Sequence, residues 1–129
     1  MNSMKKFLII ILFVVLITGC GNDNSSDKAK VMKVNKTEAV EKIENDAILI
    51  DVRSSAEYET NHIDGAININ VDDILNSNGA LIYDNSEIGF NKTVIVYCRS
   101  GSRSNTAANK LIELGYTNVY DLGSIDNWN

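Results

Sequence analysis

The chain has 129 residues, of which 44% are hydrophobic and 22% are charged, so it has room for one small domain. Its formal net charge of −5 disfavours binding to the phosphate backbone of a nucleic acid, because such binding needs a basic face on the protein. We therefore exclude a nucleic-acid partner. No residue set resembles a metal site, and we expect neither a metal nor another cofactor.

Residues 1–19 have the features of a signal peptide. Lys5 and Lys6 form a basic start, and the run from Phe7 to Ile17 is apolar and uncharged. As a helix this run would be about 16 Å long, roughly half of the ~30 Å thickness of bilayer hydrocarbon. The run therefore fits an export signal better than a membrane span.

The sequence Ile17-Thr18-Gly19-Cys20 resembles a lipobox. The resemblance implies cleavage before Cys20, lipidation of its thiol, and an extracytoplasmic lipoprotein anchored to either the inner or the outer membrane. Two alternatives stay open: an ordinary cleaved signal in which Cys20 has no role, and an uncleaved signal anchor. Loss of residues 1–19 removes two lysines and no acidic residue, which changes the net charge from −5 to −7.

The next segment, residues 20–31, consists of this cysteine and small polar residues without apolar periodicity, so we expect a flexible linker. The folded domain is then residues 32–129. Its only cysteine is Cys98, which has no internal partner if Cys20 carries lipid. A free thiol in an exported domain needs a functional reason.

Strand patterns and helix patterns alternate along this domain. Predicted strands cover 33–34, 47–52, 66–69, 93–97 and 118–120. Predicted helices follow caps at Asn35 and Asn70, cover 55–59, and run from about Arg103 to a stop at Gly115. Residues 76–91 are predicted to be mostly loop. The alternation predicts an α/β fold with a mainly parallel central sheet flanked by helices on both faces.

Two polar segments directly follow the strongest predicted strands. Asp51 and Arg53 frame the first, and the second runs from Cys98 to Ser104. Because the carboxyl ends of parallel strands meet at one edge of a sheet, we expect both segments to face one crevice.

All three arginines of the chain lie in these segments: Arg53, Arg99 and Arg103. The planar guanidinium fork matches oxyanions, which predicts a site for a small anion. In the alternative interpretation, the first and third of these arginines pair with Asp51 or Glu57 and only brace the loops.

The loop after Cys98 contains the small residues Ser100, Gly101 and Ser102. Small residues let successive backbone N–H groups turn inward as an anion-binding nest, and a following helix adds the positive end of its dipole. Both effects stabilise a negatively charged sulfur, so Cys98 is predicted to react as a thiolate nucleophile.

Five motifs then occur in order and at compatible spacing: Ile50-Asp51-Val52-Arg53, Glu57-Tyr58, His62-Ile63-Asp64-Gly65-Ala66, Tyr97-Cys98-Arg99-Ser100-Gly101-Ser102-Arg103-Ser104, and Leu114-Gly115-Tyr116. Together they resemble a single-domain rhodanese, from roughly residue 32 to the end. This resemblance implies a small rhodanese-like domain with thiosulfate-type sulfurtransferase activity.

In that family reaction, Cys98 would be the catalytic nucleophile. It would form a persulfide from a donor such as thiosulfate and pass the sulfur to an acceptor, which is cyanide in an assay and a thiol in the cell. The implied persulfide-binding and substrate-binding residues share one loop: Arg99, Ser100, Gly101, Ser102, Arg103 and Ser104. Arg99 would meet the oxyanion of the donor, whereas Arg103 would anchor the loop. Asp51 and Arg53 would support the site.

The loop length separates this resemblance from phosphatases and arsenate reductases of the same fold, which follow Cys-x5-Arg. Four residues separate Cys98 from Arg103, which favours sulfur over phosphate. His62 resembles a structural motif residue of the family and is expected to bond a loop without a catalytic role.

Two further functions remain open. One is a membrane-tethered persulfide relay or binding module with no independent turnover, and the other is a thiol-disulfide oxidoreductase, which lacks the usual Cys-x-x-Cys pair. The expected partners are a small sulfur-containing anion or thiol, the membrane through lipid on Cys20, and an unidentified sulfur-acceptor protein.

Overall fold

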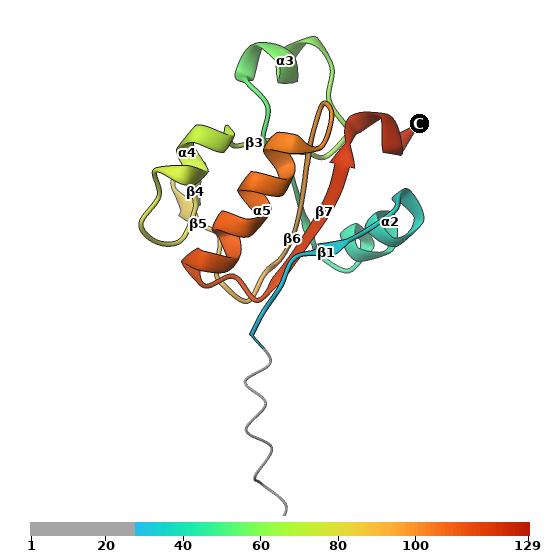
Figure 1. Ribbon diagram of the computed structural model, residues 1–129. Helices are drawn as coiled ribbons and strands as arrows, with labels where there is room; N and C mark the ends of the chain where they lie inside the picture. Colours follow the sequence, from blue (N-terminus) through green and yellow to red (C-terminus); the bar gives the residue numbers. More distant parts are fainter. Residues whose placement is uncertain (1–27) are drawn as a thin grey trace, which may run out of the picture.

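The computed structural model describes residues 28–129, which form a parallel five-stranded sheet with helices on both faces (Figure 1). This confirms the predicted fold class. The predicted signal peptide and Cys20 lie outside the described residues. Among residues 28–129, no helix has the length and apolar character that a membrane span needs.

The strand order is β1-β7-β6-β2-β3, and every neighbouring pair is parallel. The strands have these bounds: β1 Met32–Lys33, β2 Ile48–Asp51, β3 Ile67–Asn68, β6 Thr93–Cys98 and β7 Asn118–Ser124. β7 was predicted to end at Tyr120 and continues to Ser124. It contains one extra residue, because Val96 pairs with Asp121 while the next residue of β6 pairs with Gly123.

The helices are short except for the one that follows β6. Their bounds are α2 Lys36–Glu44, α3 Ser55–Thr60, α4 Val71–Leu75, α5 Ser102–Leu114 and the 3-10 helix η1 Ile125–Trp128. Asn35 and Glu38 form the predicted capping box at the start of α2, and Asn70 caps α4 as predicted. α5 begins one residue before the predicted start and ends at Gly115 as expected.

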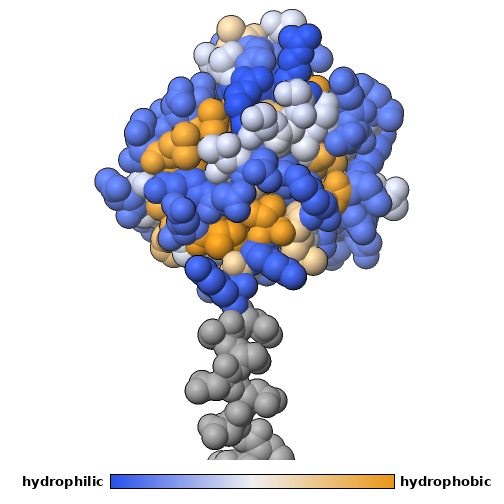
Figure 2. Space-filling view, viewed as in Figure 1, coloured by the Kyte–Doolittle hydropathy of each residue, from blue (hydrophilic) through white to orange (hydrophobic). Residues whose placement is uncertain are grey.

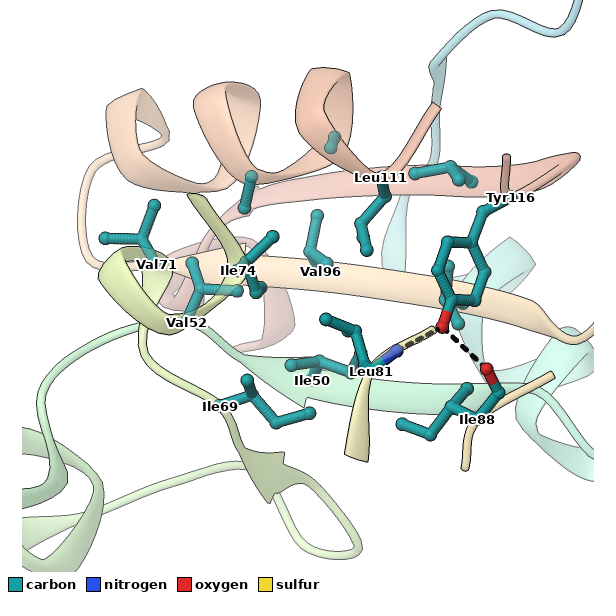
Figure 3. Packing of buried hydrophobic residues seen from close by; sticks show 14 of the residues in the cluster. Ile50, Val52, Ile69, Val71, Ile74, Leu81, Ile88, Val96, Leu111 and Tyr116 are labelled. Atoms are coloured by element: carbon teal, nitrogen blue, oxygen red, sulfur yellow. Dashed lines mark hydrogen bonds between the residues drawn. The ribbon is translucent and has the colours of Figure 1, made fainter. Parts of the chain in front are cut away.

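Alternating residues of β6 face two separate hydrophobic layers. Val94 and Val96 pack with α4 and α5, whereas Ile95 and Tyr97 pack with α2 and the C-terminal segment. Figure 3 shows the first of these layers. Because the central strand is buried on both faces, its last residue is held in a fixed position between the two layers.

The loop predicted at residues 76–91 contains an antiparallel hairpin of β4 Ile82–Tyr83 and β5 Ser86–Glu87. Two-residue strands are too short to give an alternating sequence pattern, so the prediction missed them. The flanking backbone is fixed by Tyr116, whose hydroxyl accepts a hydrogen bond from the Leu81 N–H and donates one to the Ile88 carbonyl (Figure 3).

Candidate functional site

The two polar segments predicted to share a crevice lie side by side at the carboxyl edge of the sheet. β2 and β6 are parallel neighbours, and Asp51 is in register with Tyr97. Beyond the ladder, the Val52 N–H donates to the Tyr97 carbonyl at 3.0 Å. The loop that contains Arg53 and the loop that starts at Cys98 therefore leave the sheet next to each other.

Cys98 ends β6 as a fully buried residue, four positions before α5 begins at Ser102. Its sulfur accepts a hydrogen bond from the Gly101 N–H, with an N···S distance of 3.0 Å. Gly101 has φ +101°, a conformation that residues with a side chain rarely adopt. The loop thus needs glycine at this position to aim a backbone donor at the sulfur.

Ser104 closes the same loop from within. Its buried hydroxyl donates to the Gly101 carbonyl at 3.1 Å, and that carbonyl also accepts from the Asn105 N–H. Ser100 and Ser102 are exposed. The predicted nest therefore has one inward hydroxyl that fixes the backbone and two hydroxyls that face solvent.

Arg103 is held by Glu57 of α3 through two hydrogen bonds of 2.7 and 3.0 Å. These hydrogen bonds are the main reason that the pKa of Glu57 is lowered to about 2, and a hydrogen bond from the Ser54 N–H is the second reason. The pair ties the first turn of α5 to α3, which is the loop-anchoring arrangement expected for Arg103.

Arg53 forms a buried ion pair with Asp51. Its Nη2 lies 2.7 Å from the Asp51 carboxylate and also donates to the Asn61 carbonyl at 2.6 Å. Hydrogen bonding to Asp51 is the main cause of a raised Arg53 pKa. The guanidinium also lies 5.8 Å from the centre of the Tyr97 ring. The geometry matches the bracing alternative, because Nε and Nη2 of the guanidinium both bond Asp51.

Arg99 differs from the other two arginines. Its side chain is exposed and, within residues 28–129, it makes no ion pair. It lines an open cleft of about 460 Å³ with the following residues: Arg53, Glu57, Thr60, Asn61, Ile125 and Asp126. The Cys98 side chain does not line this cleft, because the loop 99–102 covers the sulfur.

The cleft lies at the polar end of the molecule. In the space-filling view, the end that carries α3 and the C-terminus is mainly hydrophilic or neutral, and hydrophobic residues are visible at the left, in the lower middle and at the right of the domain (Figure 2). A polar cleft with a free guanidinium suits a small charged ligand.

His62 has a structural position. Its Nδ1 lies 2.8 Å from the Tyr58 carbonyl, and its ring stacks on the Tyr58 ring at 3.8 Å. The Tyr58 hydroxyl in turn donates to the Ala66 carbonyl. These contacts brace the turn before β3, which is the loop bonding expected of His62.

The C-terminal segment adds two site residues that the sequence did not indicate. The Ser124 hydroxyl donates to the Arg99 carbonyl at 2.5 Å, and Asp126 lines the cleft. No local pattern marks them, because their position depends on the extra residue in β7. In the part of the chain that the structure describes, no group of three or more His, Cys, Asp or Glu side chains could hold a metal ion.

Comparison with known proteins agrees with this geometry. Residues 35–129 match the family described as Rhodanese-like domain. The chain is 37% identical over 76 residues to thiosulfate sulfurtransferase PspE of Escherichia coli (strain K12), covering 59% of this chain and 68% of that protein. The human single-domain sulfurtransferase TSTD1 superposes with a TM-score of 0.64 at 22% identity, covering 80% of this chain and 96% of that one, which supports the fold alone.

A third relative is much longer. The adenylyltransferase and sulfurtransferase UBA4 of Candida albicans is 34% identical over 116 residues, which is 86% of this chain and 26% of that protein. The chain thus spans about a quarter of the length of UBA4.

Proposed function

The chain belongs to the rhodanese-like family, and on that premise we propose that it is a sulfurtransferase of the thiosulfate type. The single observation that carries the proposal is the placement of the Cys98 sulfur against the Gly101 N–H, at the start of α5, with the unpaired Arg99 next to it. The names of its relatives, including a thiosulfate sulfurtransferase, support the same reaction.

In the first step, the Cys98 thiolate attacks the outer sulfur of thiosulfate. The sulfur–sulfur bond of thiosulfate breaks, sulfite leaves with the electron pair, and a persulfide anion remains on Cys98. Arg99 meets the oxyanion of the donor at the cleft. In the second step, an acceptor such as cyanide or a thiol bonds to the outer sulfur, and the electron pair of the broken bond returns to the Cys98 sulfur.

A negative charge stays at the sulfur throughout this cycle, so a fixed donor is useful in every state. The Gly101 N–H and the helix dipole of α5 supply such stabilisation without rearrangement. A dipole end contributes about 0.3–1 kcal/mol at an exposed charge and up to ~2 kcal/mol at a partly buried one. We propose that residues 99–104 hold the persulfide in this way.

The commitment of Arg103 supports sulfur transfer over phosphate chemistry. A phosphatase loop uses its arginine to hold a tetrahedral anion, but here Nη1 and Nη2 of Arg103 both bond the Glu57 carboxylate, which neutralises its charge. The short loop leaves Arg99 as the arginine available to a ligand.

The burial of Cys98 favours one second candidate. Because the sulfur is covered by its own loop, a persulfide relay that turns over only when a partner protein opens the site is compatible with this structure. Fast turnover with thiosulfate and cyanide alone would exclude the relay.

The experiment that tests the proposal is the intact mass of residues 21–129 before and after thiosulfate, and again after cyanide. We expect a gain of one sulfur atom, which cyanide removes as thiocyanate, and no gain in Cys98→Ser. A folded, reduced protein whose mass never changes would contradict the proposal. Thiocyanate production by Cys98→Ser would disprove the role of this residue.

We also propose that Cys20 carries lipid and anchors the domain outside the cytoplasm. The described chain enters β1 at the amino end of the sheet, opposite the edge where the Cys98 loop lies (Figure 1), so an anchor there would leave the cleft accessible. Incorporation of labelled fatty acid by the wild type and not by Cys20→Ser is the expected result. Equal labelling would rule out this anchor.

A further inference from the structure

Two unpaired charges of opposite sign line the cleft, Arg99 and Asp126. Within residues 28–129, neither side chain makes an ion pair. The other charged groups of the cleft are already committed, because Arg53 bonds Asp51 and Glu57 bonds the guanidinium of α5. Among the residues that the structure describes, a ligand in the cleft therefore meets one cation and one anion that form no ion pair.

A shared hydrogen-bonded link fixes these two residues relative to each other. The Ser124 hydroxyl donates to the Arg99 carbonyl at 2.5 Å and accepts from the Asp126 N–H at 3.1 Å. Ser124 is also in register with Cys98 at the end of β6. The backbones of the two charged residues are thus held beside the residue that carries the sulfur.

The segment that carries Asp126 is itself well anchored. The Asn127 side chain donates to the Leu122 carbonyl at 2.8 Å, and the Gly123 N–H donates to the buried Asp121 carboxylate at 2.8 Å. These bonds hold η1 at the edge of the cleft, so the backbone position of Asp126 is set by the fold.

This pair of charges does not suit thiosulfate alone. The dianion gains from Arg99 but is repelled by Asp126, whereas a zwitterion satisfies both groups. We infer that the cleft selects a zwitterionic amino-acid thiol such as free cysteine as the sulfur acceptor, with its carboxylate on Arg99 and its ammonium group on Asp126. The inference rests on the proposed sulfurtransferase function.

The transfer step is balanced without an added oxidant or reductant. The sulfur of the acceptor thiol bonds to the outer sulfur of the Cys98 persulfide anion, and the thiol proton moves to that outer sulfur. The bond between the outer sulfur and Cys98 Sγ breaks, its electron pair returns to Cys98 as a thiolate, and the proton stays on the amino-acid persulfide that leaves.

The test compares kcat/KM for cysteine and for N-acetylcysteine, which lacks the ammonium group, in the wild type and in Asp126→Asn. We expect the ratio of the two constants to fall about fivefold in the variant, the scale of an exposed ion pair worth up to ~1 kcal/mol. Comparing ratios cancels the different intrinsic reactivities of the two thiols. Loading of Cys98 by thiosulfate should become about two- to fivefold faster in Asp126→Asn, because a like charge is removed.

The matched control is Asp46→Asn, which makes the same charge change at an exposed residue between α2 and β2. This site lies at the amino end of the sheet, away from the cleft. We therefore expect the ratio of kcat/KM for cysteine and N-acetylcysteine to stay unchanged, and the rate of Cys98 loading by thiosulfate to stay unchanged as well. An unchanged acceptor ratio in Asp126→Asn, with normal loading by thiosulfate, would overturn this inference and leave the sulfurtransferase function intact. Absence of loading in the wild type would instead contradict the proposed function.

Discussion

The loop after β2 and the loop after β6 leave the same edge of the sheet, and each contains arginine, yet they are built differently. The first is closed, because Arg53 is buried against Asp51 and its Nη2 bonds both that carboxylate and the Asn61 carbonyl. The second covers Cys98 and places Arg99 at the cleft, where it forms no ion pair with any residue of 28–129. Carboxylate partners thus decide which arginine braces the fold and which is available to a ligand.

The largest expected effect comes from breaking the closed loop. Asp51→Asn leaves the buried Arg53 charge uncompensated, and removing one partner of a buried pair costs roughly 3–5 kcal/mol. The free energy of unfolding, measured by urea denaturation at pH 7, should fall by about this amount. Asp46→Asn, with the same charge change at an exposed position, should stay within about 0.5 kcal/mol of the wild type. A loss below ~1 kcal/mol in Asp51→Asn would mean that the pair does not brace the loop.

The open loop should respond in the opposite way, in activity and not in stability. Arg99→Ala removes an exposed side chain, so its unfolding free energy should change by less than about 0.5 kcal/mol. Its kcat/KM for thiosulfate should fall about tenfold, which corresponds to ~1.4 kcal/mol. The kcat/KM for an uncharged persulfide donor should fall less, because that donor has no oxyanion for the guanidinium to bind.

The control for this variant is Lys92→Ala, which removes one exposed positive charge from the turn before β6, at the other end of the strand. The kcat/KM of Lys92→Ala should equal that of the wild type for both sulfur donors. Equal losses with both donors in Arg99→Ala would argue against binding of the donor oxyanion.

Much of this architecture follows from local sequence patterns. The continuous apolar runs predict the central strands β2 and β6, and side-chain caps predict the starts of α2 and α4, because these features depend on neighbouring residues. The convergence of the two loops follows as well, since the carboxyl ends of parallel strands share an edge. The short hairpin β4–β5 is different, because its stability depends on Tyr116, which lies far along the chain.

The sequence predicts which residues form the candidate site, but it does not predict most of the contacts between them. The sequence places three arginines at one edge but leaves open which of them pair with carboxylates, since Glu57 is distant in sequence from Arg103. The position of Asp126 was not predictable for a related reason. It depends on how an extra residue in β7 directs the C-terminal segment back over Arg99.

The smallest expected effect concerns the Glu57–Arg103 pair, which joins the open loop to α3. The folded protein lowers the pKa of Glu57 from 4.5 to about 2, so the pair stabilises the fold above pH 4.5 and loses this effect as the pH falls toward 2. Both side chains are about one-third exposed (30% and 37%), so we expect only about 1 kcal/mol.

Glu57→Gln tests this charge by itself, because glutamine can still accept the capping-box hydrogen bond from the Ser54 N–H. Urea denaturation of wild type and variant across pH 7 to 2 should show a difference in unfolding free energy of about 1 kcal/mol at neutral pH that shrinks toward zero at pH 2. Other carboxylates titrate in both proteins and cancel in the difference. A difference that stays constant with pH would assign the effect to packing, and the open loop would then be held to α3 by shape and not by charge.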